Sequence, residues 1–143
     1  NGLSGNSVAE YFGYFTPKES GEHTFRLGSF SSYQLWISNN HALYDFKQEN
    51  ADIDSSRGSM MNDNYFKINL QKNVYYPIRF IILNDSNNTI NGPLLRINSP
   101  SGNVIMNNTN DFKYFISLME NGKPYYKKVV YFGFVQHKNI ILV

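Results

Sequence analysis

The stretch GYFTPKESGEHTFRLGSFSSYQLWIS, residues 13–38, decides the fold class of this chain. In its middle part, HTFRLGSF, Phe25 and Leu27 fall on one face of an alternating pattern of apolar and polar residues. In its last part, YQLWIS, Leu35 and Ile37 repeat that pattern. Alternation with a period of two is typical of a half-buried β-strand, and the segment TPKESGEH carries Pro and Gly where a turn is needed. The stretch therefore predicts three consecutive strands connected by turns.

The same pattern extends in both directions along the chain. No segment has a helical period, and turn signals every ~8–12 residues predict an all-β antiparallel sandwich or barrel. Residues 47–64 lack a sustained period and predict a long surface loop. The first strand of the opening stretch begins before it and covers residues 7–15, and further strands are predicted at residues 64–71, 74–84, 94–99, 103–106, 111–119, 125–136 and 139–143.

Length and composition restrict the class of protein. The 143 residues are near the size of one domain, and the absence of cysteine excludes disulfides and thiolate chemistry. The net charge of +2 and the scattered Lys and Arg residues predict no nucleic-acid partner. No apolar run reaches the ~18–20 residues of a membrane span. The chain begins at Asn1 rather than Met, as a fragment or a processed product would.

Enzyme chemistry is not indicated by any motif. The segment GSFSS, residues 28–32, lacks the second glycine of a nucleophile elbow, and no phosphate-binding loop is present. No pair of carboxylates stands out as the two acids that a glycosidase requires. The three histidines, His23, His41 and His137, are far apart and are predicted to be turn or surface residues. We therefore expect a protein that is not an enzyme.

Five motifs in a fixed order carry a resemblance to a known family. They are Gly-Tyr-Phe, Pro-x-x-x-Gly, Thr-x-x-Leu, Leu-Trp-Ile and Tyr-Pro-Ile-Arg, at residues 13–15, 17–21, 24–27, 35–37 and 76–79. Together they resemble the PA14 superfamily, and in particular its GLEYA branch of fungal adhesins, over residues 8–102. The resemblance implies a jelly-roll-like β-sandwich. We expect this sandwich over residues 1–119, and a C-terminal β extension over residues 120–143 that packs on the same domain or on a neighbouring chain.

The resemblance also bears on a metal site. In lectin members of the superfamily, two consecutive aspartates before the Leu-Trp strand bind calcium, and the calcium binds sugar hydroxyls. Alignment on Leu35 and Trp36 places this pair at Phe30 and Ser31, or at Ser31 and Ser32 with a one-residue gap. Neither choice supplies a carboxylate, although calcium requires six to eight hard oxygen ligands. We therefore expect no metal at the family position and no cofactor, with calcium disfavoured.

A calcium site elsewhere is a weaker alternative. Acidic residues surround the irregular loop and are better explained as solvated side chains. They are Asp45, Asp52, Asp54 and Asp63.

Four residues are candidate ligand-binding residues. Trp36 either stacks on a sugar ring or a protein partner, or fills the core of the sandwich. Asp85, Asn87 and Asn91 lie in the polar segment 84–93, where they either bind hydroxyl groups or form ordinary turns.

Two functions are compatible with these observations. The first is a non-enzymatic structural or interaction module outside the cell, on a cell surface, or on a virus or phage particle. It would contact other protein chains, with its C-terminal strands extending a sheet across an interface. The alternative is a carbohydrate-binding adhesin, or lectin, domain that uses the loops at one end of the sandwich, in residues 47–64 or 84–93.

Overall fold

The structure is a computed structural model that describes residues 3–28, 32–57, 65–91, 95–106, 114–117, 119–120, 123–124 and 127–130. These residues form β-strands and three short 3₁₀ helices, and they include no α-helix. The strands are β1 (Ser7–Phe15), β2 (Gly21–Arg26), β3 (Ser32–Trp36), β4 (Ile53–Asp54), β5 (Tyr65–Leu70), β6 (Tyr76–Asn84), β7 (Arg96–Asn98), β8 (Val104–Met106), β9 (Phe115–Ser117), β10 (Met119–Glu120), β11 (Lys123–Pro124) and β12 (Lys127–Val130). The all-β prediction is confirmed.

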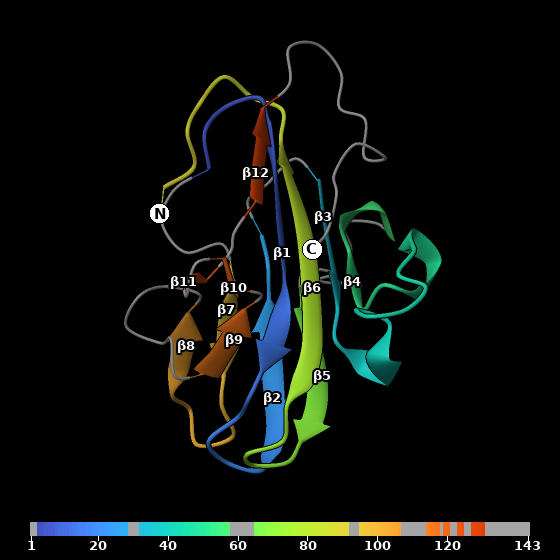
Figure 1. The fold of residues 1–143 in the computed structure, drawn as a ribbon, viewed down its shortest axis with the longest axis vertical. Coiled ribbons are helices and arrows are strands. Elements are labelled where there is room, and N and C mark those ends of the chain that lie inside the picture. Colours follow the sequence, from blue (N-terminus) through green and yellow to red (C-terminus); the bar gives the residue numbers. More distant parts are fainter. Residues whose placement is uncertain are drawn as a thin grey trace.

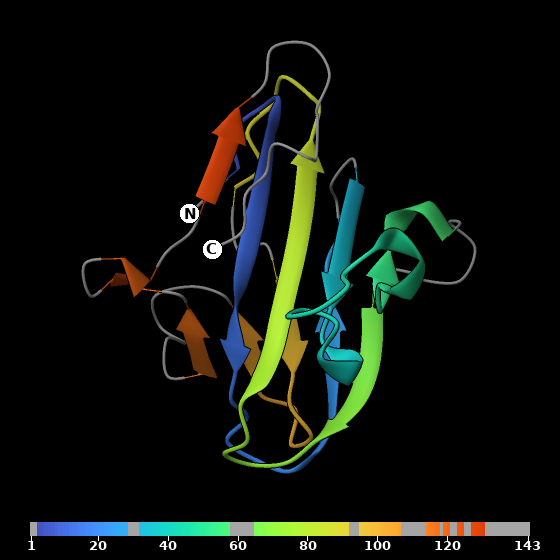
Figure 2. The same cartoon turned by 45° about the vertical axis from the view of Figure 1, so that its right-hand side comes forward.

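The strands form two main antiparallel sheets (Figure 1). The larger sheet has the order β12-β1-β6-β3-β4, with β9 also paired to β1. The second sheet has the order β5-β2-β7-β8, and β10 and β11 form a separate pair. Figure 2 shows the long strands β1, β6 and β3 side by side in one layer, with β5 of the second sheet at their right. This two-layer arrangement confirms the predicted sandwich.

One core lies between the two main sheets. Phe15 of β1 meets Phe25 of β2 edge to face, with ring centroids 5.3 Å apart. Tyr11 stacks on Phe80 of β6 at 5.2 Å. A fully buried side chain of this kind contributes about 1.5–3 kcal/mol relative to an exposed one. The remaining buried members of the core are Leu3, Ala9, Leu27, Leu35, Ile37, Ile53, Leu70, Ile78, Ile82, Leu95, Ile97 and Ile105.

His23 corrects one prediction made from the sequence. It was expected in a turn or on the surface, but it is fully buried, with its ring 5.9 Å from the ring of Phe15. Alternate residues of a strand point to the same face, and His23 precedes Phe25 and Leu27 by two and four residues. His23 therefore faces the core with them. Its Nδ1 lies 3.0 Å from the carbonyl oxygen of Gly21.

Strand β1 is held on both of its edges. One edge pairs with β6 from Ser7 opposite Asn84 to Phe15 opposite Tyr76. The other edge carries β12 and β9 at its two ends. The described strands that follow residue 114 therefore include two that join the larger sheet of this same chain. The last predicted strand, 139–143, lies outside the described residues.

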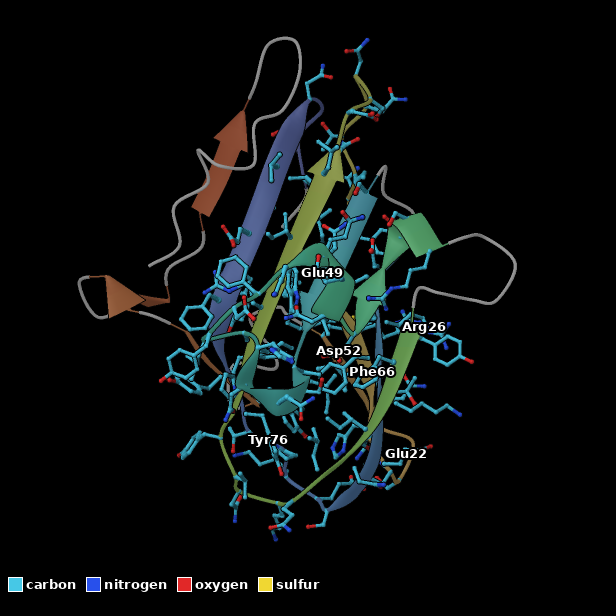
Figure 3. The ribbon with its side chains drawn as sticks, turned by 90° about the vertical axis from the view of Figure 1, so that its right-hand side faces the viewer. Glu22, Arg26, Glu49, Asp52, Phe66 and Tyr76 are labelled. Carbon is cyan, nitrogen blue, oxygen red and sulfur yellow. The ribbon has the colours of Figure 1, made fainter. Side chains whose placement is uncertain are left out.

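Residues 37–57, which we call the excursion, follow β3 and cover the outer face of the larger sheet. The excursion contains the 3₁₀ helices η1 (Ser38–Asn40), η2 (Gln48–Asn50) and η3 (Ser55–Arg57) as well as β4. Figure 3 shows the part that holds Glu49 and Asp52 lying across the larger sheet. The predicted irregular loop 47–64 thus has local structure up to Arg57, and its residues 58–64 lie outside the described part. None of the described helices is long and apolar enough to span a membrane.

Candidate functional site

Strand register brings the start of β1, the end of β6 and the start of β3 to one end of the sandwich. Ser7 at the start of β1 lies opposite Asn84 at the end of β6, and Ser32 at the start of β3 lies opposite Leu83. Residues 3–6 before β1 and residues 85–91 after β6 therefore lie at the end of the sandwich where β3 begins (Figure 1). We call residues 84–91 the polar loop. The family metal positions Phe30 and Ser31 lie next to this end in sequence, but outside the described residues.

The polar loop exposes hydrogen-bonding side chains to solvent. Three of the sequence-predicted site residues, Asp85, Asn87 and Asn91, are exposed here, together with Asn88 and Thr89. Carboxylate, amide and hydroxyl groups offer both donors and acceptors, which is what a ligand rich in hydroxyl groups requires. The structure thus brings three of the four candidates into one loop.

Asn84 organises the polar loop from within. It is buried, and its Nδ2 donates to the carbonyl oxygens of Ser4 at 3.2 Å and Asn88 at 2.8 Å. Its Oδ1 accepts a hydrogen bond from the Ser86 hydroxyl at 2.9 Å. These bonds use both ends of the amide, so Asn84 shapes the loop and is not available to a ligand. Sequence reasoning missed this role, although an Asn at the end of a long apolar strand is a recognisable turn former.

The chain segment before β1 packs along the polar loop. Leu3 and Ile90 exchange two backbone hydrogen bonds of 2.7 and 2.8 Å. The Asn6 backbone N–H donates to the carbonyl oxygen of Ser86 at 2.9 Å, and the Asn6 side chain donates to Oδ1 of Asn87 at 2.8 Å. The exposed side chains therefore project from a backbone that is tied down.

The described residues of the polar loop include one carboxylate. Asp85 is the carboxylate of the polar loop, and the oxygen of Asn84 is already engaged. Ser32 offers an uncharged hydroxyl 3.5 Å from that of Ser55. Among the described residues, no group of three or more His, Cys, Asp or Glu side chains is placed to hold a metal ion. Calcium sites usually combine several carboxylates with other hard oxygen ligands, so the single described carboxylate of the loop agrees with the expectation of no calcium here.

Trp36, the fourth candidate, lies far from the polar loop. It is opposite Arg79 in β6, four residues along β3 from Ser32, which corresponds to about 13 Å of strand. Only 3% of its surface is exposed, and it packs with Ala42 and Ala51 of the excursion. Its Nε1 donates to the Lys47 carbonyl oxygen at 3.0 Å. This geometry places the indole inside the protein and gives a ligand no ring face to stack on.

The acidic residues of the excursion have structural partners. Asp52 accepts hydrogen bonds from the backbone N–H groups of Ile37 and Ser38 at 2.7 and 2.8 Å. Asp54 accepts from the Gln34 side chain and from the Ser56 backbone, at 3.1 and 3.0 Å. These carboxylates fix the path of the excursion. Asp45 forms a surface ion pair with Lys47, and Asp63 lies outside the described residues.

A buried ion pair lies beneath the excursion. Nη1 of Arg79 is 3.1 Å from Oε1 of Glu10, and the two side chains are 5% and 1% exposed. Nε of Arg79 donates to the carbonyl oxygen of Ala42 at 2.8 Å. Its guanidinium carbon lies 4.2 Å from the ring centre of Phe12 and 3.9 Å from that of Phe46. Burial lowers the pKa of Arg79 to about 10, against the opposing effect of Glu10, so Arg79 is charged at neutral pH.

The fold and its polar end define a β-sandwich domain with a loop-based candidate site, and comparison with known families identifies which one. A family profile described as the GLEYA domain matches residues 7–92, which is more than half of the chain. The chain therefore belongs to the GLEYA domain family. The resemblance drawn from the five motifs is confirmed. No protein in a search of curated sequences matches the chain.

Solved structures show the same fold in an adhesin. One match is the epithelial adhesin 6 A domain (Epa6A) from Candida glabrata, solved in complex with Galβ1-3GlcNAc. The TM-score is 0.56 at 23% sequence identity, and the match covers 76% of this chain. This chain spans 50% of the adhesin chain, so the likeness concerns the shared sandwich.

Proposed function

We propose that this chain is a carbohydrate-binding adhesin domain that binds glycans through the polar loop. The observation that carries the proposal is the cluster of exposed Asp85, Asn87 and Asn91 side chains on a backbone held at several points. Membership of the GLEYA family and the glycan in the adhesin complex support it. The proposal involves no catalytic step, and it places the domain at a cell surface.

The comparisons favour this alternative over the structural-module interpretation of the sequence. Neither the family match nor the solved adhesin is described as a virus or phage protein. Strand β12, which lies in the predicted C-terminal extension, is paired to β1 of the same chain. We therefore do not carry the particle-protein interpretation further.

Binding of a glycan by the polar loop is the first testable consequence. The probe is immobilised Galβ1-3GlcNAc within a glycan array, and we expect saturable binding to at least one galactose-containing glycan. The double substitution Asp85→Ala and Asn91→Ala is expected to weaken this binding by about 10–100-fold. A hydrogen bond to a charged group is worth about 1.5–3 kcal/mol, and tenfold corresponds to about 1.4 kcal/mol.

The matched control for these substitutions is Asn98→Ala. Asn98 is equally exposed but lies on β7, in the other sheet. The control is expected to leave affinity unchanged. Absence of saturable binding to every glycan on the array would overturn the proposed function, and equal losses in the control would remove the site from the polar loop.

We also propose that glycan binding by this chain is independent of calcium. Phe30 and Ser31 stand where lectin relatives carry carboxylates, and the described residues of the polar loop include one carboxylate. Glycan affinity is therefore expected to stay within twofold when EDTA replaces calcium in the buffer. The melting temperature is expected to be the same in both buffers, because an ion that binds only the folded state would raise it. Loss of glycan binding in EDTA, with recovery on adding calcium, would contradict this expectation.

A further inference from the structure

We infer that residues 3–6 form a clamp that holds the polar loop in one conformation, and that Gly5 and Asn6 are positioning residues of the glycan site. The inference rests on the proposed function only for its effect on glycan affinity. The clamp itself is a matter of backbone geometry.

The clamp forms hydrogen bonds to the polar loop near both ends of the loop. Near the end of the loop, Leu3 and Ile90 donate to each other's carbonyl oxygens at 2.7 and 2.8 Å. Near its start, the Asn6 N–H donates to the Ser86 carbonyl oxygen at 2.9 Å. Between these ties, Ser4 accepts a hydrogen bond from Nδ2 of Asn84 at 3.2 Å. All of these bonds join segments about 80 residues apart in sequence.

Gly5 allows the two backbones to approach each other closely. A Cβ atom at this position would lie 2.6 Å from the Asn87 carbonyl oxygen and 2.7 Å from the Ser86 carbonyl oxygen. Both distances are well inside van der Waals contact, and both partners are backbone atoms that cannot rotate away. Any larger residue at position 5 must therefore push the clamp and the polar loop apart.

Asn6 fixes a side chain of the proposed site directly. Its backbone has a φ of 51°, a left-handed conformation that Asn tolerates better than most residues. This conformation directs its Nδ2 to Oδ1 of Asn87, at 2.8 Å. Because that bond is accepted by the oxygen of the Asn87 amide, it sets which way the amide is turned. Asn6 therefore determines which hydrogen-bonding groups of the Asn87 side chain are directed toward a glycan.

A clamp of this kind matters because the internal hydrogen bonds of the polar loop, made by Asn84 and Ser86, tie the loop only to itself and not to the rest of the sandwich. Its residues from Asp85 to Thr89 are all exposed, and it contains no regular strand before the single bridge at Ile90. Ordering an exposed loop during binding reduces affinity, and a preorganised loop avoids that loss. The clamp supplies this order before the glycan arrives.

The test is Gly5→Ala, read by two independent measurements. Hydrogen exchange of the backbone amides of residues 85–90 is expected to accelerate at least tenfold, and affinity for the bound glycan is expected to fall about tenfold. The control is Gly102→Ala at the opposite end of the sandwich, where φ is 93° and no atom lies within 4 Å of the added Cβ. Alanine rarely adopts this positive φ, so Gly102→Ala strains the backbone locally. It should nevertheless leave hydrogen exchange in the polar loop and the glycan affinity unchanged.

The outcomes separate the clamp from the proposed function. Unchanged exchange in the polar loop of Gly5→Ala would overturn the clamp, whatever the glycan data show. Faster exchange with no glycan binding by the unmodified protein would support the clamp and reject the proposed function.

A second variant keeps the test valid if Gly5→Ala does not fold. Asn6→Gly keeps the left-handed backbone and removes only the side-chain bond. It is expected to shift the NMR resonances of the Asn87 side-chain amide and to weaken glycan binding by about three- to tenfold. The matched control is Asn73→Gly, at a φ of 64° in the turn before β6. It should change neither the resonances of the Asn87 amide nor the glycan affinity. An unshifted Asn87 amide in Asn6→Gly would show that Asn6 does not position it.

Discussion

Replacing Arg79 with alanine is expected to lower the free energy of unfolding by about 3–5 kcal/mol, because it leaves the buried Glu10 carboxylate without its cation. The same substitution removes the hydrogen bond to the Ala42 carbonyl oxygen and the contacts with the rings of Phe12 and Phe46. For a domain of this size, we expect the melting temperature to fall by roughly 10 °C. Urea denaturation followed by far-UV circular dichroism measures the effect.

Two further variants give this prediction its controls. Arg96→Ala removes an exposed arginine of β7 and is expected to change stability by less than about 0.5 kcal/mol. Glu10→Leu combined with Arg79→Met removes both charges and keeps similar volumes, so it should recover most of the loss. A loss below about 1 kcal/mol for Arg79→Ala would show that the ion pair is not closed in the folded protein.

Replacing Trp36 with alanine is expected to cost about 3–5 kcal/mol, the range for removing a large buried aromatic side chain. The indole packs with Ala42 and Ala51 and donates hydrogen bonds to Lys47 and to Asn50. Its loss should loosen the excursion from the sheet, so tritium or deuterium exchange should rise first in residues 41–52. Thermal unfolding gives the magnitude.

Trp36→Phe and glycan titration decide between the two interpretations of this residue. The phenylalanine variant keeps most of the packing and loses both hydrogen bonds, and we expect a smaller cost of about 1–2 kcal/mol. For a structural tryptophan, glycan affinity of the folded protein remains within twofold in both variants. A tenfold loss of affinity in a stable Trp36→Phe protein would instead return the indole to the binding site.

The sheets could be predicted from the sequence because local alternation decides which face is buried. The strand predicted at residues 7–15 has the observed bounds of β1, and Phe66, Ile68 and Leu70 of β5 all pack on the core face. Strand identity depends on this local pattern and on turn residues, and both are visible in a single sequence.

The details of the site could not be predicted because they depend on contacts between distant segments. The clamp joins residues 3–6 to a loop about 80 positions later, and nothing in the local pattern near Gly5 indicates its partner. Trp36 lies on the outer face of its strand, which in most sandwiches is solvated. The excursion covers that face here, so an apparently exposed indole is buried.

The double-sided pairing of β1 sets the shortest length of chain that can fold. The family match ends at residue 92, yet Leu95, Ile97 and Ile105 fill the core, and β9 and β12 occupy the second edge of β1. A truncation at the family boundary would open the hydrophobic interior and leave a free strand edge that invites aggregation. We therefore expect that recombinant expression of this domain has to extend through Val130, well beyond the residues by which the family is recognised.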